Sequence, residues 1–174
     1  DAYDKGYDDA LKNESELTEQ VNYYKELTDS YYSTILEYQS QIEEYETLNQ
    51  TNQSTISSLE QSKKDLELQV ESLTLNKTNN EETIKNLNVQ IESLQNQVES
   101  LESSGLGKDE QIVQLNSQIA NLQEMVLQLQ TTNDINTSTI KTLNSQITSL
   151  NKQIIELSNQ VVSNDNSLSS LKSK

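Results

Sequence analysis

Residues 84–101 read IKNLNVQIESLQNQVESL. Apolar side chains recur in this stretch with alternating steps of three and four residues, at Ile84, Leu87, Ile91, Leu94, Val98 and Leu101. This spacing is the heptad pattern of a coiled coil, in which positions a and d of each seven residues face a partner helix. We place Ile84 at a and Leu87 at d, and call the a and d positions together the seam. The stretch therefore predicts a helix that pairs with another helix.

The same register extends in both directions, with no inserted or missing residue between Leu17 and Leu171. Ile or Val occupies 15 of the 24 a positions, and Leu occupies 14 of the 25 d positions. A strict seven-residue repeat imposes a left-handed supercoil. We therefore expect an all-α protein, a single long left-handed parallel coiled coil. The predicted oligomer seam consists of Val21, Tyr24, Tyr31, Ile35, Tyr38, Ile42, Tyr45, Ile56, Leu59, Ile84, Leu87, Ile91, Leu94, Val98, Leu101, Ile112, Leu115, Ile119, Leu122, Ile140, Leu143, Ile147, Leu150, Ile154 and Leu157.

One short segment, residues 103–107, offers an alternative to an uninterrupted helix. It reads Ser-Ser-Gly-Leu-Gly and could form a turn between two antiparallel helices. The chain has no Pro and three Gly, two of which lie here. Because the heptad phase is the same on both sides, we expect a soft point near residues 103–108 rather than a loop. Each Gly costs a helix about 1 kcal/mol.

Composition excludes several classes of function. Apolar residues make up 32% of the chain, close to the roughly 29% that a seam of two residues in seven requires. A net charge of −16 argues against nucleic acids and anionic membrane surfaces as partners. The chain has no Cys or His, and no apolar run is long enough to cross a bilayer. We therefore expect no cofactor, no metal site and no direct membrane insertion.

Polar residues interrupt the seam every 28 residues, which defines an internal superrepeat of four heptads. These interruptions fix the register of paired helices, because sliding one helix by seven residues would bury an unpaired amide at a cost of order 1–3 kcal/mol. Drift after duplication, or anions held between amides, are the alternatives. The predicted register layers are Asn49, Asn52, Lys77, Asn80, Lys108, Asn133, Asn136 and Asn164.

The N-terminal part of the chain differs from the rest. Residues 1–48 hold all eight Tyr, and 13 acidic residues against three Lys. We expect an irregular or frayed acidic lead-in at residues 1–16, a Tyr-rich acidic coiled coil at 17–48 and the superrepeat coiled coil at 49–174. The acidic face is either solvated or docks a basic partner surface.

The number of strands follows from the seam and its flanks. Ile or Val at a with Leu at d favours a parallel dimer. The flanking e and g positions are mostly uncharged, with Gln at several g positions such as Gln90 and Gln118, and carry few of the charges by which dimers choose partners. Tyr and Asn at d also suit a wider axis. We therefore expect a homotrimer in preference to a dimer.

Catalytic chemistry is not expected. Neighbouring carboxylates such as Glu43 and Glu44 diverge by about 100° around a helix and are solvated. A thin coiled coil also lacks the concave pocket that an active site needs. The segment from Gly105 to Lys108 has neither the spacing nor the preceding strand of a phosphate loop. We therefore expect no enzyme.

Recurrent Asn at d, seen at Asn52, Asn80, Asn136 and Asn164, together with neutral flanks, resembles the stalks of trimeric bacterial adhesins and bacteriophage fibres. The resemblance implies a homotrimeric structural fibre, stalk or spacer on a virion or cell surface. Such a fibre would bind other structural proteins at its ends. One alternative is a cytoplasmic tether with partners along its exposed apolar b positions, which are Leu106, Val113, Leu127, Ile155 and Val162. A third reading, a tape-measure or filament-forming rod, would use the 28-residue period to set stagger.

Overall fold

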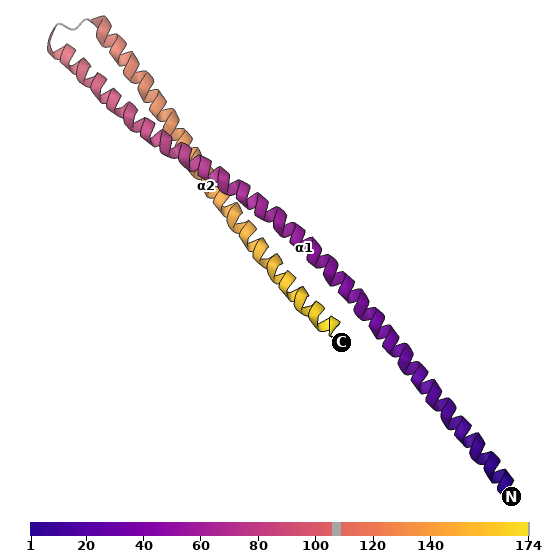
Figure 1. Ribbon diagram of the computed structural model, residues 1–174. Helices are drawn as coiled ribbons and strands as arrows, with labels where there is room; N and C mark the ends of the chain where they lie inside the picture. Colours follow the sequence, from indigo (N-terminus) through magenta and orange to yellow (C-terminus); the bar gives the residue numbers. More distant parts are fainter. Residues whose placement is uncertain (106–108, 174) are drawn as a thin grey trace. The chain divides into compact units, whose positions relative to one another are not determined.

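The computed structural model describes residues 1–105 and 109–173, and these form two long helices (Figure 1). Helix α1 spans Ala2–Ser103 and helix α2 spans Asp109–Lys172. No strand occurs in the described ranges. The predicted all-α class is confirmed.

Helix α1 ends in a glycine cap, which corrects the expectation of one uninterrupted helix. Gly105 has φ +59°, a left-handed conformation that glycine adopts readily and that commonly ends a helix. The last carbonyls of α1 are satisfied locally. The Ser104 amide donates to the Ser100 oxygen at 3.1 Å, the Gly105 amide donates to the Glu102 oxygen at 3.4 Å, and the Ser104 hydroxyl donates to the Leu101 oxygen at 2.9 Å. The N-terminal part of the predicted soft point, residues 103–105, is thus the end of helix α1. Residues 106–108, including the predicted layer residue Lys108, lie outside the described residues.

The chain divides into two units, which we describe separately. Unit 2 comprises Ile56–Glu156 and contains the C-terminal part of α1 and the N-terminal part of α2. Asn76 bonds to Asn136, and Asn80 bonds to Asn133. Since rising numbers on α1 meet falling numbers on α2, the two segments pack antiparallel. The core is formed by Leu87, Ile91, Val98, Ile119 and Val126, each 7–9% exposed.

Unit 1 comprises Asp1–Thr55 and Leu157–Lys174. Its two segments also pack antiparallel, because Asn52 bonds to Gln160, Asn49 to Asn164 and Glu46 to Lys172. Within this unit the first part of α1 extends past the end of α2 with no other segment beside it, as the indigo end of the ribbon shows (Figure 1).

The expected irregular lead-in at residues 1–16 is instead helical, since α1 begins at Ala2. Its first turn is closed by the Lys5 amide, which donates to the Asp1 oxygen at 3.2 Å. Asp4 lies in that turn, where a carboxylate interacts favourably with the helix dipole. Local hydrogen bonding and charge therefore outweigh the missing heptad pattern.

Burial follows the predicted register closely. From Ile42 to Leu101, and again from Ile112 to Leu171, every a and d position is buried or half-buried. In each unit, the partner that covers them is an antiparallel segment of the other helix of the same chain. A parallel arrangement of several chains stays a prediction.

Candidate interaction surface

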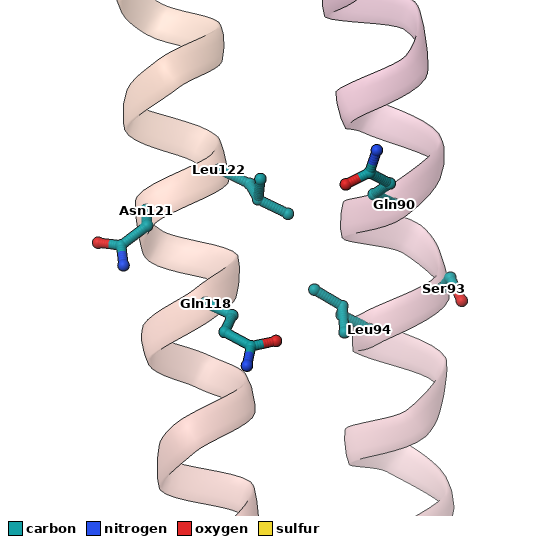
Figure 2. Close-up of a pocket in the computed structure, with 6 residues that line it drawn as sticks. All are labelled: Gln90, Ser93, Leu94, Gln118, Asn121 and Leu122. Atoms are coloured by element: carbon teal, nitrogen blue, oxygen red, sulfur yellow. The ribbon is translucent and has the colours of Figure 1, made fainter.

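In unit 2, the seam side chains of α1 and α2 lie between the two helices. Leu94 of α1 and Leu122 of α2 point into the space between the helices, whereas Ser93 and Asn121 point away from it (Figure 2). Leu94 and Leu122 pack against the core cluster of this unit. Leu94 and Leu122, both predicted at the seam, thus lie between α1 and α2 of the same chain, and their contact with another chain stays a prediction.

A groove with a volume of about 420 Å³ runs beside these leucines. Gln90 and Gln118, both at g, form its polar wall (Figure 2). Its lining holds no ionisable side chain. The groove therefore has no carboxylate, imidazole, thiol or amine that could transfer a proton.

Asparagines form a hydrogen-bonded layer across unit 2. The Asn80 amide donates to the Asn133 oxygen at 2.9 Å, and the Asn136 amide donates to the Asn76 oxygen at the same distance. The Asn133 amide donates to the backbone oxygen of Lys77 at 3.3 Å. Asn133 and Asn136 are each only 8% exposed. Asn76 was not among the predicted layer residues, although its place at g beside Lys77 could have indicated it.

A second asparagine layer lies in unit 1. The Asn164 amide donates to the Asn49 oxygen at 2.9 Å, and the Asn49 amide donates to a carboxylate oxygen of Asp165 at 2.7 Å. The Asn52 amide donates to Gln160 at 3.4 Å. Within the described ranges, no buried side-chain nitrogen or oxygen lacks a partner. The amides therefore satisfy one another, and nothing in either layer points to a bound anion.

The layers match because the superrepeat is symmetric about the midpoint of residues 106 and 107. Asn49 lies as far before the midpoint of residues 106 and 107 as Asn164 lies after it, and the same holds for Asn80 and Asn133. Antiparallel packing in this register brings a-position Asn49 opposite d-position Asn164, and d-position Asn80 opposite a-position Asn133. A slip of one heptad would instead place Asn49 and Asn133 opposite Leu, and Asn80 and Asn164 opposite Val or Ile.

The first part of the predicted seam has no partner. We call Leu17, Val21, Tyr24, Tyr31 and Ile35 the N-terminal seam, and these side chains are 51–64% exposed. Burial begins at Tyr38, which is half-buried, and continues at Ile42. The N-terminal seam is thus an apolar stripe in register with a packed interface but left open to solvent.

Further apolar side chains lie outside the seam. Val113, Leu127, Ile155 and Val162, the described members of the predicted b series, are 57–66% exposed. They recur along α2, and each directly follows an apolar seam residue at a. Isolated exposed apolar residues are common on soluble surfaces, so this series is a weaker candidate surface than the N-terminal seam.

Two negative findings concern the described residues alone. No group of three or more acidic residues in the structurally described part of the chain is arranged to hold a metal ion. None of the helix segments described has the length and apolarity to cross a membrane.

In each unit the two segments form an α-helical antiparallel pair, and in unit 1 the N-terminal seam is open. Comparison with protein-family models, curated proteins and solved structures gives no match.

Proposed function

We propose that the chain is a non-catalytic structural element, a coiled-coil spacer that assembles with further copies of itself and holds other proteins at a distance. The observation that carries this proposal is the use of the heptads. The a and d positions from Ile42 to Leu101 and from Ile112 to Leu171 are buried or half-buried, while the remaining described positions are almost all exposed. The buried side chains of such a chain therefore lie almost entirely in contacts between helices.

A disulfide between the helices of unit 2 tests the proposal. The chain has no Cys, so the double variant Leu94→Cys/Ile119→Cys carries only the two engineered thiols. In the folded-back spacer, oxidation gives an intrachain disulfide and a helical circular dichroism spectrum. Disulfides that link chains only to one another would contradict the folded-back form.

A parallel homotrimeric stalk on a virion or cell surface is the second candidate. Its support is the heptad register, which is unbroken between Leu101 and Ile112 and would let one helix continue through the turn. The stalk would use the same seam residues that α1 and α2 use with each other, so one chain cannot adopt both forms at once. Interchain disulfides at residues 94 and 119, with a mass of three chains in sedimentation equilibrium, would favour the stalk.

Two further candidate functions are each supported by one observation. The exposed b series on α2 suits a cytoplasmic tether, which would bind partners along its length. The 28-residue period suits a rod that sets stagger in a filament. Capture of a helical partner that is lost when Leu127 and Ile155 are replaced by Ser would favour the tether over the spacer.

A further inference from the structure

The N-terminal seam continues an interface that already exists in unit 1. There α2 covers the stripe of α1 as far as Ile42, near the point where α2 ends at Lys172. The same stripe runs on through Ile35, Tyr31, Tyr24 and Val21 without a change of register. A helix in water depends on packing of its apolar face for most of its stability. A partner helix on this stripe would extend the packing by residues 17–41.

The distribution of charge indicates which partner fits. The acids between residues 17 and 41 are Glu19, Glu26, Asp29 and Glu37, and all four lie at b, c or f, away from the seam. At the flanking e and g positions of this segment the single charged residue is Lys25. A second copy would therefore bring no carboxylate into the interface, whereas a basic partner in the seam would find its counter-charges on the outer faces.

The end of α2 indicates the direction. In a parallel pair, both copies would have their stripes filled by α2 from Ile42 onward, so the two α1 helices would have to separate at the same level. In an antiparallel pair, each open stripe of residues 17–41 faces the open stripe of the other copy, and the covered parts lie at opposite ends. We infer that two copies of the chain pair antiparallel through the N-terminal seam, with a two-fold axis midway between residues 29 and 30.

This pairing gives apolar layers throughout. As in unit 2, where d-position Asn80 meets a-position Asn133, each a residue meets a d residue. Val21 faces Tyr38 of the other copy, Tyr24 faces Ile35, and Thr28 faces Tyr31, each twice by symmetry. On one flank Lys25 lies next to Tyr32 of the other copy, where a cation–π contact can form. Register shifts of seven or 14 residues toward the N-terminus would bring Glu14 into the seam.

The inference rests on the folded-back spacer proposed above, so its test begins from a chain locked in that form. The oxidised Leu94→Cys/Ile119→Cys variant is purified and examined by sedimentation equilibrium. We expect a mass of two chains of 19.7 kDa each. Ile35→Asp, which puts a charge into two symmetric layers, should weaken the self-association at least tenfold. Leu36→Asp is the matched control, because this neighbouring side chain lies at b, and it should leave the mass unchanged.

Single cysteines then report the direction of the pair. Antiparallel pairing about the inferred axis separates the two copies of residue 24 by 11 residues, or about 16 Å along the helix, which is beyond the reach of a disulfide. A mixture of Tyr24→Cys and Ile35→Cys chains should form mixed disulfides on oxidation, and Tyr24→Cys alone should form few.

Each outcome distinguishes the two proposals. If the intrachain lock does not form, the folded-back spacer fails. If the lock forms and the locked chain keeps the mass of one chain, the pairing alone is overturned and the stripe serves another partner. Disulfides of Tyr24→Cys with itself, or a mass of three or more chains, would also overturn the antiparallel pair.

Discussion

Asn49 and Asn164 are 115 residues apart in the sequence, yet they share a hydrogen bond of 2.9 Å in the seam of unit 1. One occupies an a position and the other a d position. A pair of this kind forms only when the two helix segments run antiparallel in a single register. Because Asn80 and Asn133 form a corresponding pair in unit 2, the polar interruptions of the seam specify how the chain folds back.

Replacing one member of an asparagine pair should destabilise the fold. In Asn80→Leu the buried oxygen of Asn133 loses its donor, which should lower the free energy of unfolding by about 1 kcal/mol in thermal or denaturant unfolding followed by circular dichroism. Replacing both partners, in Asn80→Leu/Asn133→Leu, should recover most of the loss because no amide is left unpaired.

The control for this pair is Asn79→Leu, because Asn79 is exposed at a c position. A surface change of this kind should alter the unfolding free energy by less than about 0.5 kcal/mol. Equal losses for Asn79→Leu and Asn80→Leu would contradict a role for the layer.

Removing all the amides should loosen the register. In a variant with Leu at residues 49, 52, 80, 133, 136 and 164, a slip of seven residues no longer buries a seam asparagine against an apolar side chain. Added cysteines at 91 and 115, one heptad out of register, should then form an intrachain disulfide. In the natural sequence, cysteines at 91 and 122 should form it instead. Formation of the shifted disulfide in both backgrounds would show that the asparagines do not set the register.

Replacing Gly105 or Gly6 by alanine should change the free energy of unfolding in opposite directions. Gly105→Ala places a Cβ on a left-handed residue and should cost about 1 kcal/mol. Gly6 lies inside α1, and a Cβ there would meet nothing within 4 Å, so Gly6→Ala should favour the helix by about 0.5–1 kcal/mol. Thermal unfolding of the two variants at one concentration measures both effects. A stabilising Gly105→Ala would indicate a helix that continues through the turn.

Core and surface positions of the same helix should differ strongly. Ile91 is 8% exposed and Val89 is 61% exposed. Ile91→Ala removes packing from the core of unit 2 and should cost about 2–4 kcal/mol, whereas Val89→Ala should cost less than about 0.5 kcal/mol. Denaturant unfolding compares the two. Similar values would mean that the two-helix seam does not supply the stability.

Much of the fold could be read from the heptads. Ile91, Leu122 and Ile147 were predicted at the seam, and each is buried or half-buried there. The identity of the partner helix could not be read in the same way, since a seam residue has the same chemistry whether its partner is a neighbouring chain or the same chain. Unbroken phase on both sides of residues 103–107 is compatible with a fold-back as well, because a turn of suitable length keeps the heptad phase.

A signal for the fold-back was present in the superrepeat. Reflection about the midpoint of residues 106 and 107 places Asn49 opposite Asn164 and Asn52 opposite Val161. The same reflection places Lys77 opposite Asn136 and Asn80 opposite Asn133. A sequence with a 28-residue period is symmetric in this way about the centre of each of its polar layers, and the layer of Gly105 and Lys108 is centred on this midpoint. Periodicity alone therefore could not separate folding back from parallel registry, whereas the hydrogen-bonded pairs show that the segments within each unit pack antiparallel.

The distance between residues 72 and 141 tests the fold-back most directly. Both are exposed and lie on facing parts of α1 and α2 in unit 2. Spin labels on Ser72→Cys/Lys141→Cys, diluted into excess unlabelled chain, report this distance within one molecule by pulsed electron resonance. The folded-back chain predicts a separation of about 15–30 Å, because packed helices lie 8–10 Å apart and the labels add their own length. A continuous helix would place the labels about 100 Å apart, and that result would contradict the account.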